Sequence, residues 1–173
     1  MGILRSTSGN QPAILARISA HKKAVASVLH TGLARGHRGN PAVGIRVHNL
    51  YGVPVLLSGL AALVLTSSDI TLIENHYKES LRNMMRLNSK TPRSVIYFLA
   101  GSLPGTALIH LRQLSLFGMI TRLAGSILHR HASNTFLCGN VAESSWFHQI
   151  QKLCLKYNLP YPLDLLDLSL IHI

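Results

Sequence analysis

The sequence predicts an all-α protein, an irregular assembly of about six helices with room for one short N-terminal strand at residues 2–5. Along most of the 173 residues, apolar side chains recur every three or four positions, which is the spacing of one helix face. Prolines and N-cap residues stand where these stretches begin. No alternating apolar and polar pattern, typical of a half-buried strand, continues for a useful length elsewhere.

The first part of the chain predicts two helices joined by a basic, glycine-rich loop. An Asn-Gln-Pro start opens a helical stretch over residues 12–29, and the loop follows at residues 32–39. Asn40, with a proline directly after it, is a typical N-cap for the next helix. That helix is expected over residues 42–65. We expect a kink in it near Pro54, because proline lacks the backbone N–H that a helix needs.

The rest of the chain predicts four more helices. Asp69 suits the positive N-terminal end of the first of them, which is amphipathic. Residues 125–142 are less regular. We expect a boundary between a basic helical part, residues 1–66, and a C-terminal helical part, residues 67–173. The four helices are expected over residues 70–87, 92–101, 104–123 and 145–158.

The charges are strongly one-sided. The chain has 17 Lys and Arg against 6 Asp and Glu, which gives a formal net charge of +11. Residues 1–68 and 80–142 contain no acid at all. Cations without internal counter-charges face water or an external anion, so a polyanion, most readily a nucleic acid, is the predicted partner. A solvated basic surface and an anionic membrane surface are the alternatives. A hydrophobic content of 47% excludes a disordered polar tail.

Cysteine usage and the N-terminus bear on the compartment. Cys138 and Cys154 are the only two cysteines, which excludes a disulfide scaffold. We expect them to be reduced in a cytoplasmic or nuclear protein. No apolar signal-peptide region follows Met1, so we do not expect secretion. Gly2 followed by Ser6 also fits a loose myristoylation pattern, which leaves a lipid anchor as an alternative.

Residues 50–65 are the most apolar part of the sequence. This stretch contains no charged side chain, and a membrane span needs roughly 20 predominantly apolar residues. It is shorter than that in its strictly apolar part, and it contains Gly52, Pro54 and Gly59. We therefore expect a helix buried on all sides in a protein core, with a membrane segment as the alternative.

No pattern for catalysis or metal binding stands out. Asp164 and Asp167 are the only close acid pair, and they fit the solvent side of a short terminal helix better than a two-metal site. His129, His131 and Cys138 are one ligand cluster, whereas a structural zinc site needs two close ligand pairs. The glycine-rich loop lacks the Gly-Lys-Ser/Thr ending of a phosphate-binding loop. We expect no cofactor, no metal and no catalytic residue.

Several short segments, taken in order, resemble one family. Residues 51–60, YGVPVLLSGL, are similar to a pattern Y-x-x-P-x-L-x-Y-G-L-E found in reverse transcriptases of non-LTR retrotransposons, the LINE-like elements of animal genomes. In that family the pattern lies downstream of the catalytic palm. The other segments that resemble it are residues 2–6, 31–33, 36, 40–41, 81–82, 91–92, 103–104, 110–116, 145–147, 157–160 and 162–163.

The resemblance implies a thumb-like set of helices followed by a C-terminal helical segment of an RNA-directed DNA polymerase. In the family this region helps to hold the template–primer duplex. The catalytic Asp-Asp motif has no counterpart here, so the resemblance implies a non-catalytic fragment. Ser58 stands where the family usually has Tyr, and Ala61 where it has an acid. The implied partners are RNA or an RNA–DNA hybrid, bound weakly and in a salt-dependent way, and the palm domain that is missing here; a membrane is disfavoured.

Eight basic side chains are the candidates for contacts with nucleic-acid phosphates. They come from the two acid-free stretches and from the helix that begins near Asp69. Two other hypotheses remain: a small membrane-associated protein that uses residues 50–65, and an inert retroelement remnant with no present function. The candidate phosphate contacts are Lys22, Lys23, Arg35, Arg38, Lys78, Arg82, Arg86 and Arg93.

Overall fold

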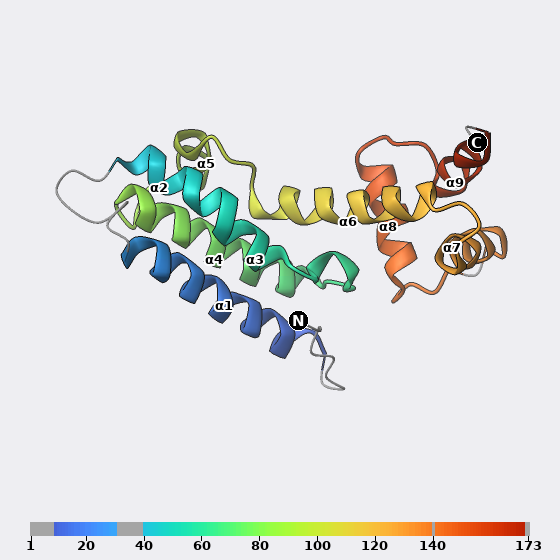
Figure 1. The fold of residues 1–173 in the computed structure, drawn as a ribbon, viewed down its shortest axis with the longest axis horizontal. Coiled ribbons are helices and arrows are strands. Elements are labelled where there is room, and N and C mark those ends of the chain that lie inside the picture. The colour runs from blue at the N-terminus through green and yellow to red at the C-terminus, as the bar shows by residue number, and fades with distance from the viewer. Residues whose placement is uncertain (1–8, 31–39, 140, 172–173) are drawn as a thin grey trace. The chain divides into compact units, whose positions relative to one another are not determined.

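The computed structural model describes residues 9–30, 40–139 and 141–171, and this part of the chain contains helices and no strands. The predicted all-α class is therefore confirmed (Figure 1). The strand expected at residues 2–5 lies outside the described residues. The chain forms two compact units: unit 1 comprises Met1–Leu60 and Leu65–Ile109, and unit 2 comprises Ala61–Val64 and His110–Ile173. The expected boundary between residues 66 and 67 falls inside unit 1.

Unit 1 is built around two long helices that pack on each other, α1 and α4. The short helices α2 and α5 pack on α4, and α3 packs on α1. Helix α6 begins in unit 1 and continues in unit 2. The bounds are α1 Gln11–His30, α2 Pro41–Val47, α3 Val53–Leu57, α4 Ser67–Met85, α5 Arg93–Ala100 and α6 Gly105–Arg122.

The helix expected over residues 42–65 is shorter and contains one wide turn. Between α2 and α3 lies a π-helical turn, η1 (His48–Gly52), in which the Val53 amide donates to the His48 carbonyl five residues earlier. Pro54 follows directly and has no amide to donate, so the wider turn takes the place of the expected kink. The helix then ends at Ser58, because Gly59 adopts a positive φ of 77°.

The apolar stretch at residues 50–65 is mostly buried within the protein. Leu56 and Leu57 in α3 are almost fully buried, whereas Leu50 and Tyr51 at its start are exposed. No single helix in the described ranges is long and apolar enough to cross a membrane. Helices α5 and α6 reach that length and composition only together, as a pair bent by 60°.

Helix α4 follows its sequence pattern closely. Thr66 and Asp69 form a capping box: the Thr66 side chain accepts from the Asp69 amide, and the Asp69 side chain accepts from the Thr66 amide. The apolar stripe expected on one face is buried, including Ile73, Tyr77 and Leu81. The helix therefore has a defined start and one core-facing side, which fixes where its basic side chains lie.

The carboxyl group of Glu74 joins three elements of unit 1 from within the core. Its residue is 3% exposed, and it accepts a very short hydrogen bond from the Tyr97 hydroxyl in α5. At the start of α6, the amide and the hydroxyl of Thr106 donate to Oε2 at 2.6 and 3.1 Å. A Cβ on Gly105 would lie 2.8 Å from the same oxygen, so glycine allows this close approach. Burial and the Glu74 contact together raise the pKa of Tyr97.

Unit 2 packs the later part of α6 with α7 (Ile127–Leu137), α8 (Trp146–Lys156) and α9 (Pro162–Ile171). Its core includes Phe117, Phe136 and Ile150. The segment 61–64 belongs to this unit because its carbonyls accept from side chains there. The Trp146 indole donates to the Ala61 carbonyl at 2.7 Å, and the Gln113 amide donates to the Leu63 carbonyl at 3.3 Å.

Helix α7 lies within residues 125–142, which were expected to be less regular. Ser126 caps the helix by accepting from the His129 amide, and Ala132 and Phe136 are buried one turn apart. Residues 129–135 include two His, one Ser, one Asn and one Thr, which have weak helix propensity. Packing of Ala132 and Phe136 in the core therefore decides the structure here, and local propensity alone did not predict it.

Removal of the Glu74 carboxyl group should destabilise unit 1 far more than removal of an exposed carboxyl group would. Glu74→Ala leaves the buried Tyr97 hydroxyl and the Thr106 amide without an acceptor, and we expect the free energy of unfolding to fall by about 3 kcal/mol. The exposed Glu143→Ala control should change it by less than about 0.5 kcal/mol. Chemical denaturation measures both, and equal effects would contradict the role given to Glu74.

Candidate nucleic-acid interface

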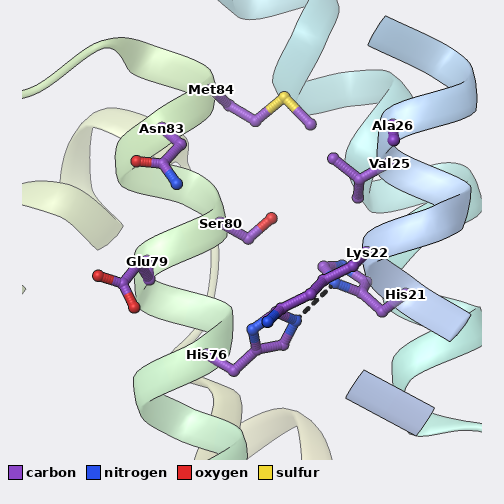
Figure 2. A pocket seen from close by; sticks show the side chains of 9 residues that line it. All are labelled: His21, Lys22, Val25, Ala26, His76, Glu79, Ser80, Asn83 and Met84. Carbon is purple, nitrogen blue, oxygen red and sulfur yellow. Dashed lines mark hydrogen bonds between the residues drawn. The ribbon is translucent and has the colours of Figure 1, made fainter. Parts of the chain in front are cut away.

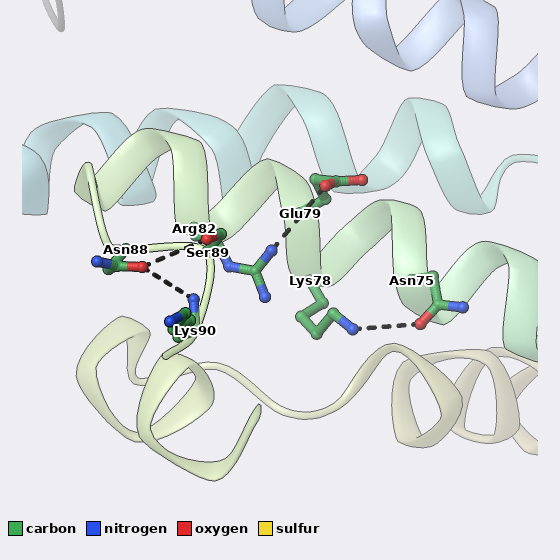
Figure 3. A network of polar contacts seen from close by, with 7 residues as sticks. All are labelled: Asn75, Lys78, Glu79, Arg82, Asn88, Ser89 and Lys90. Carbon is green, nitrogen blue, oxygen red and sulfur yellow. Dashed lines mark hydrogen bonds and ion pairs between the residues drawn. The ribbon is translucent and has the colours of Figure 1, made fainter. Parts of the chain in front are cut away.

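Helix α4 carries three of the eight candidate cations, but it does not present them equally. Lys78 and Arg82 are four residues apart and lie on neighbouring turns of the helix. Arg86 follows the end of α4 in a left-handed conformation with φ 54°, so it lies outside the helix, which was expected to continue to residue 87. Figure 3 shows Lys78 and Arg82 on α4 together with the turn that follows the helix.

Arg82, like Lys78, is only partly exposed, whereas the other candidates within the described residues are exposed. Its side chain is only 15% exposed, and it forms an ion pair of 3.9 Å with the exposed Glu79 (Figure 3). Its buried Nε atom has no hydrogen-bond partner. We therefore regard Arg82 chiefly as part of the packing around α4, with only its outer nitrogen atoms facing solvent and Glu79.

Lys78 is half-buried, and its ammonium donates to the Asn75 Oδ1 atom at 3.3 Å. Beyond the end of α4, the Asn88 side chain accepts from the Lys90 amide at 3.0 Å and orders the turn that leads to α5 (Figure 3). Lys90 and Arg93 are both exposed at this turn. Lys90 was not among the eight candidates, although it lies in the same acid-free stretch and directly before the Thr-Pro pair.

The other described candidates lie on α1. Lys22 and Lys23 are both exposed, at successive positions about 100° apart around the helix. Arg46 on α2 is exposed as well and was not among the eight candidates. Arg35 and Arg38 lie outside the described residues. The structure thus places candidate cations of unit 1 on α1, on α4 and at the start of α5.

The acids of unit 1 are engaged within the unit. Asp69 caps α4, Glu74 is buried under α5 and α6, and Glu79 pairs with Arg82. These three are the acids in unit 1 by sequence. The exposed cations at Lys23, Lys90 and elsewhere in the unit therefore face solvent with little nearby negative charge, and the surface is suited to an external anion.

A pocket of about 430 Å³ opens between α1 and α4 (Figure 2). Val25 and Met84 form apolar parts of its lining, and Lys22 reaches towards His76 at its polar end. Burial lowers the pKa of His76, and the positive charge of Lys22 lowers it further. The lining of the pocket therefore includes one cation, Lys22, and one acid, Glu79, beside an imidazole that is neutral at physiological pH.

Three imidazoles contact one another here, and two of them, His21 and His76, line the pocket. His21 Nδ1 is 2.9 Å from His76 Nε2, and His21 Nε2 is 3.1 Å from His48 Nε2. His21 uses opposite nitrogens towards its two neighbours, so the three rings do not point at one common centre. No group of three His, Cys, Asp or Glu side chains in the described ranges is arranged to hold a metal ion.

The residues that carried weaker chemical hypotheses are spread out. In α7, His129 is buried and His131 is exposed, and the exposed Cys138 follows the end of the helix. Asp164 is exposed in the first turn of α9. His110 in α6 is buried and hydrogen-bonds to the Tyr157 hydroxyl at 2.8 Å.

Comparison of the sequence with protein-family models found no match. Searches among curated proteins and among solved structures likewise found no similar protein. The function is therefore inferred from the charges and contacts described above and from the residues that resemble the retrotransposon enzymes.

Proposed function

We propose that this chain is a non-catalytic, nucleic-acid-binding region of an RNA-directed DNA polymerase of the non-LTR retrotransposon type. In this role unit 1 contacts the phosphates of a template–primer duplex. The observation that carries the proposal is the uncompensated positive charge of unit 1. The ordered motifs in the sequence support the choice of duplex and of family.

The charge balance of unit 1 favours a surface that binds a polyanion over a basic surface that only contacts water. Its described residues include nine Lys and Arg side chains against three acids, and each acid has a partner inside the unit. Most of these cations are exposed. The nine are Arg17, Lys22, Lys23, Arg46, Lys78, Arg82, Arg86, Lys90 and Arg93.

The chemistry available to unit 1 supports binding without polymerisation. Transfer of a nucleotide needs carboxylates that converge on two metal ions roughly 4 Å apart. Asp69 and Glu74 are committed to helix ends, and Glu79 is paired with Arg82. No two of these side chains are left to form such a site within the unit, so contacts with phosphate are the chemistry that remains.

Binding to an RNA–DNA hybrid should weaken steeply with salt. Each phosphate that is neutralised releases condensed counterions, and the logarithm of affinity falls by roughly 0.9 per phosphate for each decade of salt. With about five phosphates contacted, we expect a slope near −4.5 when the logarithm of affinity is plotted against the logarithm of salt concentration. Fluorescence anisotropy with a labelled 20-base-pair hybrid between 50 and 300 mM KCl measures it. An affinity that does not change with the KCl concentration, or no binding at 50 mM KCl, would disprove the proposal.

The two units should differ in their contribution to this slope. The double substitution Lys23→Ala and Arg93→Ala removes two exposed cations of unit 1, and we expect the slope to become shallower by about 2. The matched control, Arg130→Ala with Lys152→Ala, removes two exposed cations of unit 2 and should leave the slope nearly unchanged. Equal losses from both pairs would place the interface elsewhere.

Removal of a negative charge from the proposed interface should act in the opposite direction. Glu79→Gln keeps the size of the side chain but frees Arg82 from its ion pair, and we expect a two- to fivefold tighter complex at 100 mM KCl. Because Glu79 is exposed and its ion pair with Arg82 is long, at 3.9 Å, the free energy of unfolding should change by less than about 0.5 kcal/mol. Weaker binding by Glu79→Gln would count against α4 as part of the interface.

A further inference from the structure

Three imidazoles connect α1, η1 and α4 inside unit 1. His21 comes from α1, His48 from η1 and His76 from α4, and the first two are almost fully buried. The rings of His21 and His48 meet edge to face, with centroids 5.1 Å apart, and those of His21 and His76 do the same at 4.9 Å. We call this group the histidine cluster. It has no part in the proposed contacts with phosphates.

Counting protons along the histidine cluster shows that its contacts can all be made with three neutral rings, the state that burial favours. A neutral imidazole has one N–H and one bare nitrogen, and His21 uses both nitrogens at once. One proton therefore lies in each of the two contacts that His21 makes. The Ser80 hydroxyl also approaches His48 Nε2 at 3.0 Å, while His48 Nδ1 is buried without a partner.

The orphaned nitrogen of His48 indicates the direction of the chain of donors. If His48 carries its proton on Nε2, that N–H donates towards His21, and His21 Nδ1–H donates to His76. The atom then left unpaired on His48 is a bare acceptor. The reverse direction would leave a buried N–H without an acceptor, which is rarer in proteins. We therefore assign the first direction.

From this assignment we propose that the histidine cluster is an acid-sensitive latch, which holds α1 against η1 and α4 and opens when it takes up protons. A proton on His21 Nε2 would face the His48 N–H, and a proton on His76 Nε2 would face the His21 N–H. Each places two donors about 3 Å apart. A proton on His48 Nδ1 would place a positive charge on a ring that is only 2% exposed.

The charges around the histidine cluster do not offset added protons. From α1, Lys22 lies near His76, and from α4, Tyr77 stacks on His48 at 5.7 Å. Glu79 on α4 is the acid that faces the cluster, and it is exposed and paired with Arg82. Helix α3 has no titratable side chain, and Arg46 on α2 is exposed. The neighbours therefore oppose a positive charge more than they stabilise one.

The titration of these side chains sets the pH range. Burial lowers the pKa of His21 from 6.5 to about 3, with added repulsion from His48 and His76. Burial also lowers the pKa of His48 to about 4, and that of His76 falls in the same direction. The unfolded chain therefore binds more protons than the folded one below pH 6.5. The contribution of the histidine cluster to the free energy of unfolding is therefore complete above that pH and decreases as the pH falls towards 4.

Protons can reach the histidine cluster through the pocket between α1 and α4. His21 and His76 both line this pocket, and Figure 2 shows their hydrogen bond at its polar end. The contact that closes α1 onto α4 is thus next to solvent, whereas the contact of His21 with His48 is deeper. Opening is expected to begin between α1 and α4.

Hydrogen exchange of α1 tests the latch without nucleic acid, so the result is independent of the proposed function. After correction for intrinsic rates, we expect α1 amides in the full chain to exchange faster as the pH falls from 7 to 4.5. Below pH 6.5 the opening ratio should rise up to tenfold per pH unit for each proton taken up. His76→Gln removes one titrating group, so it should reduce this slope by one proton. His131→Gln, on an exposed position of α7, should leave it unchanged.

Gly52→Ala provides a second variant that adds no titratable group. The new Cβ would lie 3.1 Å from His21 Nε2 and 3.1 Å from His48 Cδ2, so it presses on the histidine cluster. We expect α1 to open at a higher pH than in the wild type. The proposal is overturned if α1 protection in the wild type is constant from pH 7 to 4.5, or if His131→Gln flattens the slope as much as His76→Gln.

Discussion

The shortage of acidic side chains is the constraint on which the rest of unit 1 depends. A buried helix start needs an acceptor for its free amides, and Glu74 supplies one to α6 while it also holds the Tyr97 hydroxyl of α5. With only three acids in the unit, this use leaves one carboxyl group for the cap of α4 and one on the surface. Two of the three acids thus serve helix starts, and little negative charge is left on the surface beside the exposed cations.

Sequence patterns predicted those elements in which local signals and packing agree. An amphipathic helix was expected over residues 70–87 with Asp69 at its start, and α4 covers Ser67–Met85 with Asp69 in its capping box and its apolar face buried. The helix predicted over residues 42–65 was too long, because Gly59 ends the helix and a π-turn precedes Pro54. Helix α7 was not predicted, because the burial of Phe136 overrides a sequence of weak helix formers.

The candidate interface was predictable in composition but not in accessibility. Charge counting identified Lys23 and Arg93, which are exposed, together with Arg82, which is mostly buried beside Glu79. Charge counting did not select Lys90, whose position depends on the turn made by Asn88. Burial of a long side chain depends on which neighbours cover its stem, and that is set by the packing of α4 rather than by the spacing of charges.

The histidine cluster was not foreseen, because its members come from residues 21, 48 and 76 and share no motif. A histidine buried between helices is commonly held by a carboxylate, which would keep it protonated or orient it. Here the acids of the unit are used elsewhere, and His21 is held by two other imidazoles. Each contact between two imidazoles needs one bare nitrogen, so protons added to both facing nitrogens would break it. Because the few acids of the unit stabilise helix starts, its buried histidines contact one another, and these contacts depend on pH. The same shortage of acids therefore makes the surface basic and limits the stability of the unit in acid.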